Sequence, residues 1–159
     1  INFLEIIMKI SNLRFLEDIE EIKKLKYFYF QACDTNNLIQ IKNTFASRDL
    51  SIDFEKFGVF TDIESFLEQY KKQSIKKNQI ECHYGKNSVF KESDNSIKGF
   101  WALDYYLFQT EKYLMTNITG SYEDLYVLED SQWVIKESKF RRNSLKIFDV
   151  SHQENLKIN

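Results

Sequence analysis

The sequence predicts an α+β domain in which helices cover one face of a meandering antiparallel sheet. In the first half of the chain, apolar residues recur every three or four positions, a spacing typical of amphipathic helices. From residue 79 onward, β-branched and aromatic residues alternate with polar ones, as in strands with one buried face. Short polar turns separate these strands, so strands adjacent in sequence are expected to pair with each other.

Three helices are predicted in the first half. The first spans residues 15–33, with a buried stripe formed by Phe15, Ile19, Ile22, Leu25, Phe28 and Ala32. Residues 34–37 (Asp-Thr-Asn-Asn) end this helix and offer caps for a second one, on which the shared face comprises Leu38, Ile41 and Phe45. A short strand is expected at 51–57. Thr61 then caps a third helix, whose buried side holds Ile63, Phe66, Leu67 and Tyr70.

Four strands are predicted in the second half, at residues 79–90, 97–108, 113–128 and 132–140. Polar turns at 91–96 and 129–131 connect them. The domain organisation that follows is an N-terminal extension at 1–14, one folded domain at 15–144 and a C-terminal tail at 145–159.

Composition excludes several classes of function. The 159 residues suffice for one domain, and 22 basic against 24 acidic residues leave a net charge of −2, which disfavours nucleic acid as a partner. Four isolated glycines cannot form the common nucleotide-binding loops, and no run approaches the roughly 20 apolar residues of a membrane span. Two cysteines without a C-x-x-C pair suit a reducing compartment, so a cytoplasmic location is expected. Neither a cofactor nor a metal is expected, because no H-x-H, H-E-x-x-H or cysteine pair is present.

Aromatic residues make up 16% of the chain. They are consistent with a cavity lining for a flat apolar ligand, but we favour the alternative of coding bias, because Phe, Tyr, Ile, Lys and Asn are enriched together.

Two acidic residues and one histidine are candidates for chemistry. His83 shares a strand face with Glu81 and Gln79, so it is either an exposed strand histidine or part of a polar site. Asp34, at the end of the first helix, is either a cap or a site residue. Asp104 is the only acid in the otherwise apolar and aromatic run 99–108. Its carboxylate is therefore paired, hydrated or part of a cavity, or it lies at an edge or bulge position that faces water. We assign Asp104 to substrate binding, with Trp101 and Tyr106 of the same strand.

Several segments together resemble the SnoaL-like branch of the nuclear transport factor 2 superfamily, near scytalone dehydratase and bile acid 7α-dehydratase. The resemblance covers residues 18–143. It rests on Leu25-Lys26-Tyr27-Phe28-Tyr29-Phe30-Gln31-Ala32-Cys33-Asp34, on Phe45-Ala46 with Ile52-Asp53-Phe54, on Cys82-His83-Tyr84, and on Gly120-Ser121-Tyr122-Glu123-Asp124 through Trp133-Val134-Ile135.

The resemblance implies a cone-shaped curved sheet with three N-terminal helices closing a pocket, the cystatin-like α+β barrel. It implies a His83–Asp34 pair across that pocket, and Tyr29 as a third catalytic residue. Phe54 and Arg142 would contact the substrate, and the outer face of the sheet would form a homodimer. Cys33 and Phe54 stand where the fungal enzyme has tyrosines, and this departure argues against scytalone itself as the substrate.

Two functions are compatible with these residues. The first is a cofactor-independent lyase or isomerase of the dehydratase type, acting on a small apolar oxygenated ring compound. His83 would remove a proton beside a carbonyl and return one to the departing hydroxyl, Asp34 would orient the imidazole, and Tyr29 would bind the enolate oxygen. The alternative is a non-catalytic protein of the same fold that binds a small hydrophobic ligand.

Overall fold

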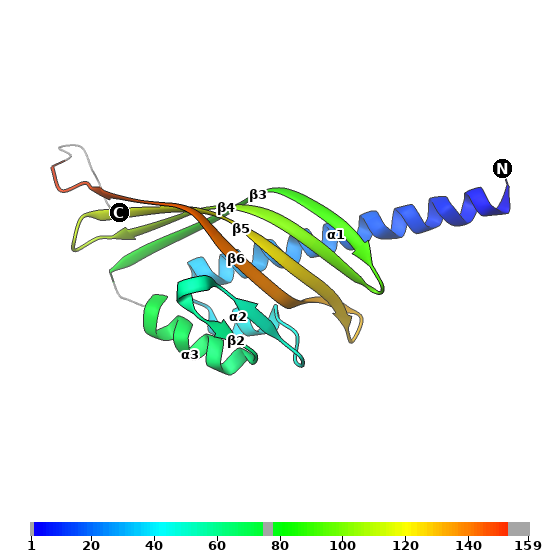
Figure 1. Cartoon of the computed structure of the whole chain (residues 1–159), viewed down its shortest axis with the longest axis horizontal. Helices are drawn as coiled ribbons and strands as arrows, with labels where there is room; N and C mark the ends of the chain where they lie inside the picture. Colours follow the sequence, from blue (N-terminus) through cyan, green and yellow to red (C-terminus); the bar gives the residue numbers. More distant parts are fainter. Residues whose placement is uncertain (1, 75–77, 153–159) are drawn as a thin grey trace.

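A computed structural model describes residues 2–74 and 78–152 (Figure 1). The helices are α1 (Phe3–Asp34), α2 (Leu38–Asn43) and α3 (Ile63–Ser74), with a short 3₁₀ turn at Glu55–Phe57. The strands are β1 (Ser51–Asp53), β2 (Val59–Phe60), β3 (Gln79–Ser93), β4 (Ser96–Gln109), β5 (Leu114–Glu129) and β6 (Gln132–Asp149). The predicted α+β class, three helices followed by a curved sheet, is confirmed.

The sheet has the strand order β2-β1-β6-β5-β4-β3. Strands β3 to β6 form the predicted antiparallel meander, but β1 pairs with β6 in parallel, so the sheet is mixed. The reason lies just before β1, where Phe45 bridges Ile135 and leads the chain alongside β6. Strand β2 was not predicted, because two residues carry no alternation. The sheet curves over the helices without closing into a barrel (Figure 1).

Helix α1 begins at Phe3, not at residue 15. Asn2 caps its first turn by accepting from the Leu4 amide, and the Glu5 carboxylate accepts in return from the Asn2 amide. Leu4, Ile7, Met8, Ile10 and Leu13 are exposed, and this part of α1 extends past the sheet (Figure 1). The expected boundaries at 14/15 and 144/145 thus fall inside α1 and β6, and residues 153–159 of the expected tail lie outside the described residues.

Helix α1 ends at Asp34, one residue beyond the predicted end. Asn36 adopts a left-handed backbone conformation with φ of 53°, which stops the helix. The Asn37 amide then donates to the Ala32 carbonyl at 2.8 Å, and Asn37 caps α2 by accepting from the Gln40 amide. This tight turn fixes the position of the Asp34 carboxylate at the end of α1.

A buried ion pair joins α1 to the sheet. The Lys26 Nζ lies 2.7 Å from the Asp124 carboxylate, and both side chains are fully buried. Asp124 also accepts hydrogen bonds from the Tyr126 and Ser138 hydroxyls, and the Lys26 ammonium lies 3.7 Å from the centre of the Tyr122 ring. Burial lowers the pKa of Lys26, and Asp124 opposes this effect. The Gly-x-Tyr-x-Asp motif of β5 therefore binds the helix that carries Asp34.

In the described part of the chain, no helix combines the length and the apolar character needed to cross a membrane.

Candidate active site

A cavity of about 320 Å³ lies between the helices and the concave face of the sheet. Its walls come from α1, the 3₁₀ turn, α3 and strands β3 to β6. They are mainly aromatic and aliphatic, formed by Tyr29, Phe54, Phe57, Phe66, Tyr70, Leu103, Tyr105, Leu107, Ile118, Tyr122 and Phe140. Its polar lining includes Glu81 and His83. The exposed lining residues, which mark the rim, are Glu55, Lys56, Gln73 and Arg142.

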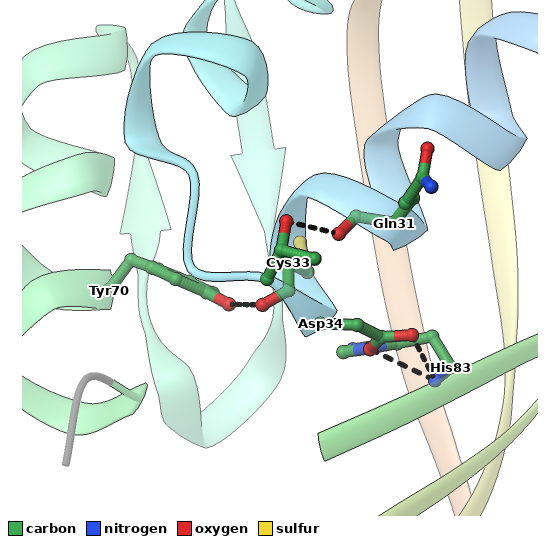
Figure 2. A network of polar contacts seen from close by, with 6 residues as sticks. Gln31, Cys33, Asp34, Tyr70 and His83 are labelled. Carbon is green, nitrogen blue, oxygen red and sulfur yellow. Dashed lines mark hydrogen bonds and ion pairs between the residues drawn. The ribbon is translucent and has the colours of Figure 1, made fainter. Parts of the chain in front are cut away.

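The structure brings His83 and Asp34 into direct contact (Figure 2). The Nδ1 atom of His83 lies 2.6 Å from an Asp34 carboxylate oxygen, and the side chains are 11% and 24% exposed. The backbone amide of His83 also donates to both carboxylate oxygens, at 3.1 and 3.2 Å. A carboxylate only accepts hydrogen bonds, so Asp34 favours the imidazole tautomer with its proton on Nδ1. The basic lone pair is then on Nε2.

Aromatic rings fix the orientation of the imidazole. Phe30 stacks on it at 5.6 Å with an interplanar angle of 12°, and Tyr105 lies 4.6 Å away on the neighbouring strand. Gly85, on the same face of β3 as His83, makes room for Phe30, because a Cβ there would lie 2.6 Å from the Phe30 ring. His83 lines the cavity on one side and, with Asp34, an outer groove between α1 and β3 on the other.

Glu81 is a cavity residue that sequence reasoning did not select. It precedes His83 by two positions on β3, and both line the cavity, which agrees with the shared face predicted for this strand. Burial raises the pKa of Glu81 to about 7; a hydrogen bond with Tyr105 opposes this shift and the charge of Asp34 adds to it. Strand alternation alone could have found this residue, since it places an acid beside the candidate histidine.

The buried tyrosine and cysteine side chains of the cavity stay neutral. Burial raises the pKa values of Tyr29, Tyr70 and Tyr105. The buried Cys33 thiol has a pKa of about 12, again because of burial, so it is a poor nucleophile. These groups therefore act as neutral hydrogen-bonding groups.

Of the residues predicted to contact substrate, Phe54 and Arg142 line the cavity, as does Tyr29. Trp101, Asp104 and Tyr106 do not line it. Asp104 is instead bound by Lys86, Asn117 and Tyr106, and Trp101 donates to the Tyr126 hydroxyl at 3.0 Å in the core. The cause is strand alternation: Leu103, Tyr105 and Leu107 face the cavity, so residues 104 and 106 face the other side. Trp101 is on the same face of β4 as Leu103 and Tyr105, but its side chain is buried in the core and does not reach the cavity.

Among residues 2–74 and 78–152, no group of three or more His, Cys, Asp or Glu side chains could hold a metal ion. The chemistry assembled in the cavity is that of a positioned base, a second carboxyl group and neutral hydroxyls.

A SnoaL-like domain matches residues 14–139. The fold is similar to that of a hexachlorocyclohexane dehydrochlorinase, LinA type 2, with a TM-score of 0.78 at 16% identity over 86% of this chain and 93% of that one. LinA type 3 from Novosphingobium barchaimii gives a TM-score of 0.77 at 17% identity over 86% and 94% of the two chains. A scytalone dehydratase candidate from Novosphingobium aromaticivorans gives 0.73 at 16% identity over 84% and 88%. The chain belongs to the SnoaL-like domain family, within the nuclear transport factor 2-like fold.

Proposed function

We propose that this protein is a cofactor-independent lyase or isomerase of the dehydratase type, acting on a small apolar oxygenated ring compound. The observation that carries the proposal is the 2.6 Å contact between His83 Nδ1 and Asp34 in the wall of an aromatic cavity. A surface histidine gains nothing from such an arrangement. A histidine that acts as a general base needs one ring nitrogen, here Nδ1, held by a hydrogen bond, and the other, Nε2, directed to the substrate. The similar dehydrochlorinase and dehydratase folds support the same class of reaction.

In the proposed reaction, His83 Nε2 takes a proton from a carbon next to a carbonyl group. The electron pair of the broken C–H bond forms the enolate, and expulsion of a group from the neighbouring carbon, or reprotonation elsewhere, completes an elimination or an isomerisation. The Asp34 carboxylate stabilises the imidazolium formed in the first step. Tyr29, neutral and buried in the wall, donates to the enolate oxygen.

The base can be tested without the natural substrate. The probe is 5-nitro-1,2-benzisoxazole, a planar aromatic compound that undergoes ring-opening elimination when a base removes its C3 proton. We expect turnover above the buffer rate in the native protein, and a loss of about 10²- to 10⁴-fold in kcat/KM for His83→Gln. His152→Gln, which changes the second histidine of the chain, is the matched control. Equal turnover by native protein and His83→Gln would overturn the assignment of the base.

The second candidate function is a binding protein with no chemistry. The observation that favours it is the extent of aromatic lining in the cavity, including Phe54 where the resemblance predicts a tyrosine. The binding function is supported if two results are found together. Planar aromatic compounds should bind with the same affinity to the native protein and to His83→Gln, and neither protein should turn over the probe.

The homodimer implied by the family resemblance remains part of the proposal. Sedimentation at micromolar concentration tests it independently of the chemistry.

A further inference from the structure

Glu81 is a cavity carboxyl that the proposed reaction leaves without a role. It and His83 are two residues apart on one face of β3, so their side chains leave the strand roughly 6–7 Å apart and point into the same cavity. A small substrate can therefore contact both groups at once. This spacing suits two groups that act on neighbouring atoms of one molecule.

The surroundings of Glu81 favour its neutral form. The titratable groups that face it are Cys33 and Asp34 from α1, Tyr70 from α3, His83 from its own strand and Tyr105 from β4. Within residues 2–74 and 78–152, no lysine or arginine forms an ion pair with Glu81. Burial and the nearby negative charge of Asp34 raise its pKa to about 7, so about half of the Glu81 carboxyls carry a proton at pH 7 and most of them do below it.

We propose that Glu81 is the general acid that protonates the departing oxygen, while His83 serves only as the base, and that the site is therefore built to expel a hydroxyl group rather than a halide. This inference rests on the proposed function and divides its two proton transfers between two residues. Hydroxide is strongly basic and leaves a carbon readily only when a proton is supplied. A chloride leaves without one, so a halide-expelling site has no use for a protonated carboxyl beside the base.

The proton balance of this division is complete. The C–H bond breaks and its proton goes to His83 Nε2, the electron pair forms the new double bond, and the C–O bond breaks as oxygen takes the Glu81 proton. Water leaves, and the site holds a Glu81 carboxylate and a His83 imidazolium. Transfer of one proton from the imidazolium to the carboxylate, directly or through water, restores the starting state. Because Asp34 binds Nδ1, Nε2 is the one ring nitrogen available to the substrate. With a separate acid, Nε2 does not have to accept the carbon proton and also protonate the departing oxygen.

The test compares two probes that differ in the basicity of their leaving oxygen. Both 1,2-benzisoxazole and its 5-nitro derivative lose a C3 proton and break an N–O bond, but the unsubstituted compound releases the more basic phenolate. Help from a general acid grows with that basicity. We expect Glu81→Gln to lower kcat/KM for 1,2-benzisoxazole about 10-fold or more and to change that for the nitro derivative less than about 3-fold. Glutamine keeps the shape and a hydrogen-bond donor, so this difference reports proton transfer.

A pH profile gives the second readout. With 1,2-benzisoxazole, the native rate should fall above pH 7 as Glu81 ionises, and the profile of Glu81→Gln should lack this decline. Glu92→Gln, the same substitution at an exposed position of β3, is the matched control and should behave as the native protein.

Two results would overturn the inference, and they are distinguishable. If turnover depends on His83 but Glu81→Gln affects both probes equally or not at all, the proposed base stands and Glu81 is no acid. If turnover does not depend on His83, the proposed function fails and the division of labour fails with it.

Discussion

The Tyr70 hydroxyl on α3 donates a 3.0 Å hydrogen bond to the backbone carbonyl of Cys33, the residue directly before Asp34 (Figure 2). This bond ties the third helix to the end of the first, at the residue next to the proposed catalytic carboxylate. Tyr70 is 6% exposed, so water does not compete for the bond. Tyr70 thus helps to hold the end of α1 against the cavity.

Removing this hydroxyl should lower the free energy of unfolding only a little, although it releases the contact that holds the end of α1. For Tyr70→Phe we expect a loss of about 1 kcal/mol in the free energy of unfolding, because the Cys33 carbonyl still accepts from the Asn36 amide. Chemical denaturation measures the change. Tyr27→Phe, at a tyrosine that is 61% exposed, is the control, and equal effects of the two substitutions would contradict the role given to Tyr70.

Breaking the buried ion pair should be far more costly. For Lys26→Met we expect a loss of about 3–5 kcal/mol, because the Asp124 carboxylate would stay buried without its cation. The double variant Lys26→Met/Asp124→Asn should be more stable than Lys26→Met alone, since no unpaired charge remains. Lys23→Met, which breaks an exposed pair with Glu20, should change stability by less than about 1 kcal/mol. A double variant less stable than Lys26→Met would refute this explanation.

The Asp34 carboxylate should determine the tautomer of His83. In the native protein at pH 9 we expect the neutral imidazole to carry its proton on Nδ1, because the carboxylate at 2.6 Å accepts it. In Asp34→Asn the new amide can donate to Nδ1, so the population with the proton on Nε2 should increase. Nitrogen-15 NMR shifts of the two ring nitrogens distinguish the forms, with His152 as the internal control. An unchanged pattern in Asp34→Asn would mean that Asp34 does not control the ring.

Glu81 should make stability depend on pH in an unusual direction. Its pKa rises from 4.5 to about 7 on folding, so the folded state binds its proton more tightly than the unfolded state. This contribution is complete below pH 4.5 and is lost as the pH rises to 7. We expect Glu81→Gln to gain stability relative to the native protein over that interval, by on the order of 2 kcal/mol. Denaturation curves at pH 5 and pH 8 measure this, and a difference independent of pH would contradict the shifted pKa.

Local patterns predicted most of the fold because each element depends on its own periodicity. The stripe that begins at Phe15 buries Ile22 and Ala32, although Phe28, predicted on the same stripe, is 55% exposed. The strands after residue 79 alternate as predicted, so helix and strand could be told apart. The early start of α1 was missed because it buries no apolar stripe that a local pattern could reveal: Leu4, Ile7, Met8, Ile10 and Leu13 are all exposed. The parallel pairing of β1 with β6 depends on a tertiary bridge from Phe45 that no local pattern contains.

The site was only partly predictable for a similar reason. The pairing of His83 with Asp34 came from the family resemblance, because 49 residues separate them and spacing alone could not join them. The alternation of side chains along a strand assigns each residue to one of two faces. It could have excluded Asp104 from the site and included Glu81, but it does not show which face of the sheet is concave. The β4 residues Leu103, Tyr105 and Leu107 answer that question only once the helices are placed.

The Asp34 carboxylate has a consequence for solubility as well as for chemistry. Strand β3 is the last strand of the sheet, and the His83 amide on it points outward to Asp34. An outward amide on a border strand is a place where a strand from another molecule can add, which leads to aggregation. By accepting from this amide and placing a negative charge there, Asp34 shields the border at the point nearest the cavity. One carboxylate therefore both positions the His83 ring and covers the backbone amide of the border strand.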